Sequence, residues 1–318
     1  MDVLTIGGLL VEIMRNELDK SFDKPAEFSG PYASGDVAIF ADVAARLGNK
    51  VAIIGTVGDD GFGRCIVNRL KADGVDVSSI RVSPDNTTGV AFVSYFSTGA
   101  RQFIFHWRHA AAGDITIDQI NPLLLDDLKC LHLSGVNLSV NDKVRDTIYY
   151  LNKSVDPSVI VSFDPNIRPE VLSVEEIRAL CQPVMERCDI FFPSESEAKM
   201  FTGLSSDDEG CRYLADQGKI VVLKRGTDGS VIYTKDNVIE VPAFSVKEID
   251  PTGAGDSFAA AFITGYLKGL PLRECGVLAN AVGAISVTKS GPMEGAPHLS
   301  TVRDFLQDVG IDDIKLDW

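Results

Sequence analysis

The chain has 318 residues, 30 of them basic and 45 acidic, so its net charge is −15 at pH 7. Hydrophobic residues make up 45% of the chain and charged residues 24%, proportions that exclude a mainly disordered protein. The acidic balance argues against nucleic acid as a partner, because a phosphate backbone is bound through clustered Lys and Arg. The same charge repels anionic substrates, so a bound anion needs a local device to hold it.

Short apolar runs alternate with helical patterns along most of the chain. Runs without polar alternation, typical of strands buried on both faces, predict strands at 3–6, 51–54, 130–133, 159–163, 190–192 and 220–223. Helical patterns, several of which stop at a glycine, predict helices at 37–47, 62–73, 140–152, 174–188 and 206–217. This order predicts an α/β fold with one doubly wound, mostly parallel sheet flanked by helices, in a single domain over 1–318.

Other stretches depart from that alternation. Residues 89–96 and 103–107 are rich in β-branched and aromatic side chains and flank a turn at 97–100, which predicts a hairpin. A second hairpin is predicted from 230–233 and 238–241, whereas 12–29 is polar without a helical stripe. A hairpin inserted into such a sheet forms either a lid or a plain extension of the sheet edge, and the sequence alone leaves both interpretations open.

Cysteine usage and the N-terminus indicate the compartment. The six cysteines are scattered without a C-x-x-C pair, which indicates reduced, mostly buried thiols. There is no apolar window of about 18 residues to predict a membrane span, and the first residues lack the basic region of a signal peptide. We therefore expect a cytoplasmic protein that binds neither membranes nor nucleic acid.

The segment 250–256, Asp-Pro-Thr-Gly-Ala-Gly-Asp, carries the sharpest chemical signal. Gly253, Ala254 and Gly255 open a helix of small residues, and a glycine-rich helix start presents free N–H groups that hold an anion such as phosphate. Asp256 would lie beside that anion and could accept a proton from a hydroxyl attacking phosphorus. The alternative is that Asp256 only complements the helix dipole and that the glycines only form a turn.

This segment resembles the C-terminal signature of the ribokinase-like (PfkB) carbohydrate kinases. Residues 47–63 resemble the other signature of that family, and 163–169, 193–198 and 222–229 match further family blocks in the same order. The resemblance covers the chain from residue 6 to about residue 297. It implies a doubly wound α/β domain with a small β lid, formed by about 12–34 and 88–108, that covers a sugar.

The resemblance also implies an activity and its residues. The family transfers the γ-phosphate of ATP to a sugar hydroxyl, with Asp256 as catalytic base and Gly253, Ala254 and Gly255 as the anion hole. Magnesium should arrive with ATP, and potassium activation is expected from a cation loop at Asp250 and Thr252. The residues expected on the nucleotide and phosphate side are Asn166, Glu197, Lys224, Gly226, Gly229, Gly253, Gly255 and Asn280. The residues expected to contact the sugar are Glu12, Gly35, Asp36, Phe92, Trp107, Arg108, Arg168 and Asp256.

The identity of the sugar rests on weaker features. Residues 164–169 and 105–108 resemble the 2-keto-3-deoxygluconate kinase branch, and Arg108 or Arg168 could clamp the carboxylate of such a sugar acid. The alternatives are a surface position for Arg108, and a phosphate contact or structural ion pair for Arg168. A neutral-sugar kinase of the fructokinase or ribokinase type is the other interpretation.

Several positions depart from the family pattern. Ser34 replaces a glycine, Ile39 stands where an Asn often contacts the sugar, Glu12 stands where an Asp is common, and Ser194 replaces an Asn. These changes leave open a catalytically weakened sensor of the same fold, because fold alone does not fix function. By likeness to the family we also expect a homodimer formed through the β lid.

Overall fold

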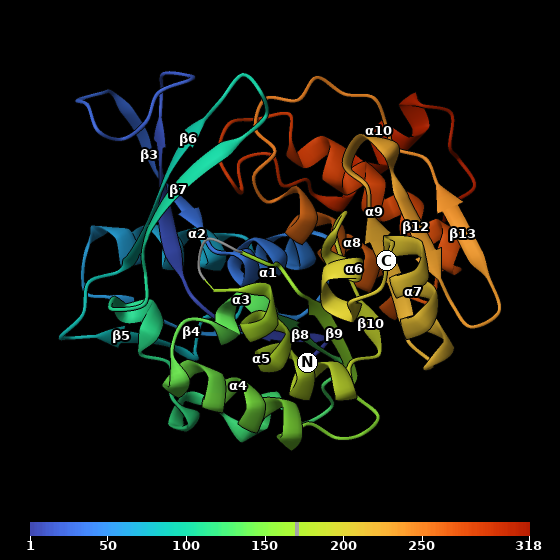
Figure 1. The fold of residues 1–318 in the computed structure, drawn as a ribbon, viewed down its shortest axis with the longest axis horizontal. Helices are drawn as coiled ribbons and strands as arrows, with labels where there is room; N and C mark the ends of the chain where they lie inside the picture. The colour runs from blue at the N-terminus through green and yellow to red at the C-terminus, as the bar shows by residue number, and fades with distance from the viewer. Residues whose placement is uncertain (169–171) are drawn as a thin grey trace.

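The computed structural model describes residues 1–168 and 172–318, and Pro169 of the block 163–169 therefore lies outside the described residues. A nine-stranded sheet runs through the middle in the order β13-β12-β11-β10-β9-β8-β1-β4-β5 (Figure 1). The seven strands from β11 through β10, β9, β8, β1 and β4 to β5 pair in parallel. The last two strands, β12 and β13, extend the sheet by antiparallel pairing. The strands are β1 Val3–Ile6, β4 Val51–Gly58, β5 Ile80–Ser83, β8 Cys130–Ser134, β9 Ile160–Asp164, β10 Ile190–Phe191, β11 Ile220–Lys224, β12 Ser230–Tyr233 and β13 Val238–Val241.

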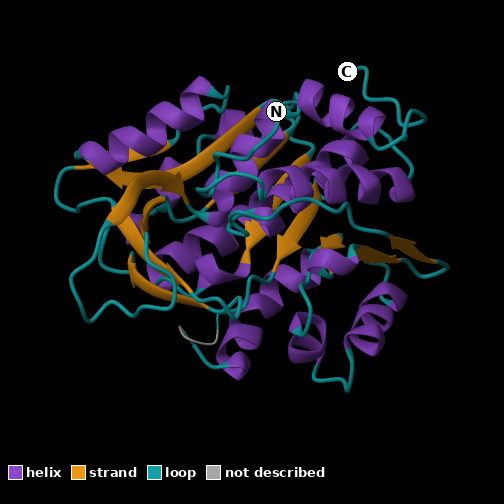
Figure 2. Cartoon of the chain, turned by 90° about the horizontal axis from the view of Figure 1, so that it is seen from above, coloured by secondary structure: helices purple, strands orange, loops and turns teal. Residues whose placement is uncertain are grey.

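Helices cover both faces of this sheet (Figure 2), and each face has its own buried apolar cluster. One cluster contains residues of α1 Asp36–Arg46, α2 Gly61–Ala72, α8 Ala254–Leu267, α9 Leu272–Ser286 and α10 Leu299–Asp308. The other contains residues of α3 Gly135–Leu138, α4 Asp142–Ser154, α5 Val174–Arg187, α6 Glu197–Thr202 and α7 Asp207–Asp216. Short 3-10 turns lie at Ala111–Gly113, Ile117–Gln119, Pro122–Leu124 and Gly226–Asp228. The predicted doubly wound α/β fold is confirmed.

A separate four-stranded sheet stands beside the main body, at the upper left of Figure 1, in the order β3-β2-β6-β7. Its strands are β2 Leu10–Arg15, β3 Phe28–Ser34, β6 Gly89–Tyr95 and β7 Arg101–His106. The hairpin β6–β7 matches the predicted one closely. The sequence did not predict β2 and β3 as strands. β2 pairs antiparallel with β3 and in parallel with β6, which is distant in sequence, so the pairing of β2 with β6 leaves no local signal.

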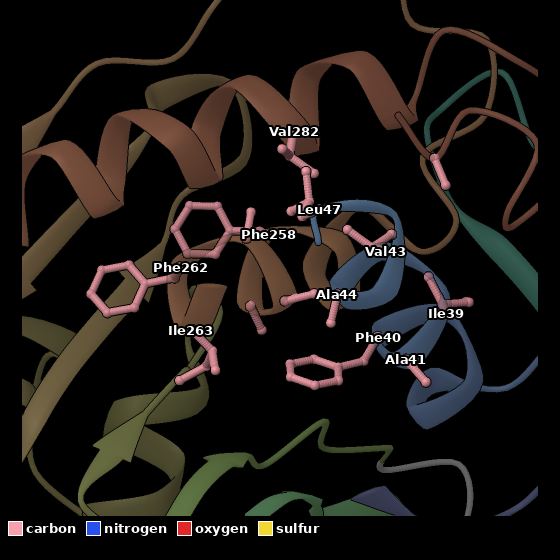
Figure 3. Packing of buried hydrophobic residues seen from close by; sticks show 14 of the residues in the cluster. Ile39, Phe40, Ala41, Val43, Ala44, Leu47, Phe258, Phe262, Ile263 and Val282 are labelled. Carbon is pink, nitrogen blue, oxygen red and sulfur yellow. The ribbon is translucent and has the colours of Figure 1, made fainter. Parts of the chain in front are cut away.

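The packing of α1 against α8 places the starts of these two helices together. Figure 3 shows side chains of α1, among them Val43 and Ala44, gathered with Phe258 and Phe262 of α8 and Val282 of α9. Phe262 is fully buried, and burial of a side chain of this size contributes about 1.5–3 kcal/mol. This apolar contact holds the N-terminal ends of α1 and α8 in a fixed relation to the sheet edge.

Helix boundaries follow the capping residues. The helix predicted at 140–152 begins at Asp142, because the Asn141 side chain accepts a hydrogen bond from the Val144 N–H. The helix predicted at 206–217 spans α7, with Ser206 as its N-cap. Within the described residues, every helix is too short or too polar to cross a membrane.

Candidate active site

Three parallel strands end at one edge of the main sheet with polar side chains. β8 ends at Ser134, β9 at Asp164 and β11 at Lys224. In open α/β sheets the carboxyl ends of the strands form the crevice where ligands bind. Asp36 at the start of α1 accepts a hydrogen bond from Ser134, so the start of α1 lies at the same edge.

The start of α8 has the geometry of an anion cradle. Gly253 is its N-cap with φ 79°, and a Cβ built there would lie 2.7 Å from the Pro292 carbonyl oxygen, so glycine is required. Among the described residues, the N–H groups of Gly255 and Asp256 have no backbone acceptor, and that of Ala254 has only a long bond of 3.4 Å. These donors point outward at the positive end of the helix dipole.

Asp256 lies in the first turn of α8, within a group of charged side chains. Burial raises its pKa well above the ordinary value, and the neighbouring carboxylates of Asp36 and Asp164 raise it further. The positive charges of Lys224 and Arg168 act in the opposite direction. The net effect is a raised pKa, so Asp256 is a stronger base than an ordinary carboxylate, and the two cations limit how far its pKa rises.

Lys224 is the counter-ion at the centre of this group. Its ammonium pairs with Asp164, and the two side chains are 11% and 5% exposed. Burial alone would lower the pKa of Lys224, but the charges of Asp164, Glu197 and Asp256 raise it, so the amine stays protonated. A Cβ built on Gly255 would lie 3.3 Å from the Lys224 Nζ, so the ammonium also reaches the anion cradle.

Glu197 organises the neighbouring loops. Its two carboxylate oxygens accept hydrogen bonds from the N–H groups of Ile167 and Ser194, each at 2.7 Å. Burial raises the pKa of Glu197, and Asp164 adds to the shift while Lys224 opposes it. Glu197 therefore acts through the backbone at 167 and 194. Ser194 takes part through its N–H, which any residue would supply.

Asp36 accepts hydrogen bonds from several donors at once. Asn137 and Asn166 each donate from Nδ2 at 3.1 Å, and the Val37 N–H donates at 2.8 Å. Gly35, which precedes it, has φ 112° and leaves no room for a side chain next to the Gly8 carbonyl oxygen. Asn166, expected on the nucleotide side, is thus bonded to a residue expected on the sugar side.

On one side of the cradle lies a cavity of about 470 Å³. It is lined by Lys224, Gly226, Gly229, Ala254, Gly255 and Asn280, all of them residues singled out in the sequence. Asn280 donates from Nδ2 to the carbonyl oxygens of Val241 and Pro242, so its amide also fixes the chain after β13. The lining residues 243–246 and Glu248 were not predicted, because they lie in the loop after β13, which carries no motif; Val287, the C-cap of α9, was not predicted either.

On the other side of the cradle, the small sheet approaches through one of its faces. Glu12 on β2 is 2% exposed, and burial together with the nearby Asp250 raises its pKa to about 8. Tyr95 at the end of β6 donates to Asp250 Oδ1 at 2.7 Å and lies 2.6 Å from Thr252 Oγ1. Asp250 Oδ2 accepts from the Gly291 N–H at 2.8 Å. The expected cation loop is thus bonded both to the main body and to the small sheet.

Not every predicted sugar contact joins this group. The β2–β6 register places Phe92 beside Ile13 on the opposite face from Glu12, where it packs against Phe22 and Phe28. Phe92 is therefore not assigned to the site, because adjacent strand residues point to opposite faces.

Arg168, Arg108 and Trp107 lie in three different environments. The charge of Arg168 opposes the raised pKa of Asp256, whereas Arg108 is exposed and donates to the Ser139 carbonyl oxygen at 3.2 Å. Trp107 is 8% exposed, with its ring 5.5 Å from that of Phe105. Trp107 thus belongs to the buried apolar core, where it packs with the other aromatic side chains of the hairpin.

Two of the unusual residues have packing roles. Ile39 is 3% exposed, and a Cβ built on Gly253 would lie 3.1 Å from its Cγ2, so Ile39 supports the anion cradle from behind. Ser34 lies 3.5 Å from the Glu12 carboxylate, at the limit of a hydrogen bond. Neither residue interrupts the charged group around Asp256.

Known proteins resemble the chain over nearly its whole length. Residues 5–299 match the pfkB family carbohydrate kinase model. The chain is 28% identical over 314 residues to the 5-dehydro-2-deoxygluconokinase of Clostridium perfringens, covering 96% of this chain and 93% of that protein. It is 29% identical over 316 residues to fructokinase-1 of Zea mays, covering 96% of each chain.

A solved E. coli structure named as a ribokinase II, in complex with ATP and Mg²⁺, superposes with a TM-score of 0.91. It is 38% identical, and the match covers 96% of this chain and 99% of that one. Matches of this extent include every block that forms the charged group, the anion cradle and the cavity. The chain therefore belongs to the pfkB family of carbohydrate kinases.

Proposed function

We propose that this sugar kinase phosphorylates a sugar acid, with 2-keto-3-deoxygluconate as the first candidate and its terminal hydroxyl as the acceptor. The observation that carries the proposal is that Arg168 lies near enough for its charge to act on Asp256, so its guanidinium is available to bind a substrate carboxylate in bidentate fashion. The 5-dehydro-2-deoxygluconokinase relatives, named for a related keto acid, support this class. The fructokinase relatives support the neutral-sugar alternative to a similar degree.

In the proposed reaction, Asp256 accepts the proton of the attacking hydroxyl while the N–H groups at 253–255 hold the phosphoryl oxygens. Phosphoryl transfer has a loose transition state, so position and charge stabilisation matter more than base strength. Lys224 supplies a fixed positive charge beside the cradle, and its ion pair with Asp164 keeps it in place. Residues of the 470 Å³ cavity would hold the nucleotide, with Asn280 offering its remaining carbonyl oxygen.

The metals are assigned through the donors that the chain offers. Magnesium would arrive with ATP, held mainly by phosphates and water, and would neutralise charge on the phosphates. A potassium ion at Asp250 and Thr252 would use oxygen lone pairs left free by the hydrogen bonds of Asp250.

The small sheet is proposed as the lid over the sugar and as the dimer surface. Glu12 faces the site from the inner face of this sheet. When the sheet covers the sugar, it would exclude water from the reacting groups. On its outer face Phe28 is 42% and Ile104 39% exposed, apolar area that a second copy of the chain would bury.

A coupled ADP-release assay with magnesium-ATP tests the proposal. The panel contains 2-keto-3-deoxygluconate, 5-dehydro-2-deoxygluconate, gluconate, fructose, ribose, tagatose and a nucleoside. Preference for a keto acid, with a KM that rises at least tenfold in Arg168→Met, would support the proposal. Preference for a neutral sugar, or an unchanged KM in that variant, would overturn the role of Arg168.

The role of Asp256 needs its own variant and control. Asp256→Asn should lose turnover by a factor of about 100 or more while it still binds ATP, since general base catalysis contributes about 100- to 10,000-fold. Asp208→Asn, which changes an exposed carboxylate in the first turn of α7, should leave turnover unchanged. Near-normal turnover in Asp256→Asn would contradict the assignment.

A further inference from the structure

One hydrogen bond connects the small sheet to the loop that forms the anion cradle. Tyr95, the last residue of β6, donates its hydroxyl proton to Asp250 Oδ1 at 2.7 Å, across 155 positions of sequence. The same hydroxyl lies 2.6 Å from Thr252 Oγ1. Gly253, the N-cap of α8, follows directly, so Tyr95 contacts the segment that positions the N–H donors.

Asp250 ties this contact to the main body. Its Oδ1 also accepts from the Thr252 N–H at 3.0 Å, and its Oδ2 accepts from the Gly291 N–H at 2.8 Å. The side chain is only 2% exposed, so water does not compete strongly for these bonds. One carboxylate therefore holds the turn at 250–252, the 291 loop and the small sheet together.

The Tyr95 hydroxyl acts as the donor in this contact, because its partner Asp250 Oδ1 is a carboxylate oxygen that can only accept. Glu12 lies on the same face of the small sheet, and its buried Oε1 has no hydrogen-bond partner among the described residues. Because Tyr95 donates its proton to Asp250 and not to Glu12, Glu12 keeps a free carboxylate oxygen that can bind a ligand covered by the sheet.

We propose that Tyr95 is a positioning residue that couples closure of the small sheet over the sugar to the geometry of the 250–253 loop. This inference rests on the proposed function, in which that sheet covers the sugar. Tyr95 and Glu12 are absent from the lining of the 470 Å³ cavity, which lies on the other side of the cradle. The coupling should therefore affect phosphoryl transfer and the sugar, and it should leave nucleotide affinity unchanged.

Tyr95→Phe removes only the hydroxyl. We expect kcat to fall about tenfold or more, because the 250–253 loop loses the charge-assisted hydrogen bond that holds the N–H donors in position. The Kd for magnesium-ATP should stay within about twofold, and the ratio of ATP hydrolysis to sugar phosphorylation should rise. The matched control is Tyr233→Phe, which removes a buried hydroxyl bonded to Asp208 and should change none of these values.

Amide hydrogen exchange provides a readout that does not depend on activity. In Tyr95→Phe, the amides of 250–256 should exchange faster than in the wild type, and in Tyr233→Phe they should not. Wild-type exchange at 250–256 together with wild-type kcat in Tyr95→Phe would overturn the coupling. If the wild type phosphorylates no sugar in the panel, the proposed function fails, and the exchange result alone then decides whether Tyr95 holds the loop.

Discussion

Lys224 holds together the charged group on which the site depends, so its replacement by methionine is a direct test. The change leaves Asp164, Glu197 and Asp256 without their shared ammonium, although the apolar part of the side chain is kept. Removing one partner of a buried ion pair costs about 3–5 kcal/mol, because the other charge stays buried without compensation. At about 2 °C per kcal/mol for a chain of this size, Tm should fall by about 6–10 °C.

The pH dependence gives a sharper signature than the size of the loss. Without Lys224, the pKa values of Glu197 and Asp256, already raised by burial, rise further. A carboxyl group with a raised folded-state pKa stabilises the fold below its unfolded pKa and loses that contribution as the pH rises through the folded value. Lys224→Met should therefore be less destabilising at about pH 5 than at about pH 8. The acid limb of kcat should move to higher pH, because Asp256 must be ionised to accept a proton.

The assay is thermal unfolding of Lys224→Met and of a control variant, Lys219→Met, each at pH 5 and at pH 8. The Lys219 ammonium donates to the carbonyl oxygens of Met185 and Cys188, at 2.7 and 2.8 Å, so its loss leaves no carboxylate unpaired. Lys219→Met should lower Tm by a similar amount at both pH values. Equal losses of Tm at pH 5 and pH 8 in Lys224→Met would refute the reasoning.

Three further changes test other parts of the site. Gly253→Ala should abolish most turnover and lower stability by at least about 1 kcal/mol, measured by urea unfolding, because its Cβ would meet the Pro292 carbonyl oxygen at a positive φ. Arg69→Met should cost about 3–5 kcal/mol in the same measurement, because it leaves the fully buried Asp42 short of a partner, and an unchanged urea midpoint would contradict this. Glu12→Gln should stabilise the fold more at pH 8.5 than at pH 5, measured as the shift in Tm, because the raised pKa of Glu12, about 8, costs stability as the pH rises.

The main sheet could be predicted because its strands are buried on both faces. β1 was predicted with the bounds that the structure shows, since three of the four residues in the run 3–6 are apolar and the run is followed by glycines. β4 was predicted too short, because its second half is defined by pairing with β5, from Gly55 opposite Ile80 onward. β5 itself is partly exposed at the sheet edge, so it lacks the apolar run on which the prediction relied.

The residues proposed for the site come from the family blocks, but their contacts depend on the fold. The strand ends Asp164 and Lys224 lie far apart in sequence. They form an ion pair because β9 and β11 run parallel on either side of the short strand β10. The placement of Asn166 on Asp36 could not be predicted, because it depends on a positive φ of 42° at Asn166. Chain order alone indicates which loops meet at an edge, and backbone conformation decides which side chains touch there.

The contact between Tyr95 and Asp250 could not be predicted from the sequence. A tyrosine at the end of a strand is an ordinary β-former, and its partner is 155 positions away. The parallel register pairs Glu12 with Ala91, which puts Ala91, Val93 and Tyr95 on the face of Glu12. A slip of one residue would move Tyr95 to the outer face with the phenyl rings and would break its bond to Asp250. The connection between the small sheet and the anion cradle is therefore a property of strand register, which no local motif encodes.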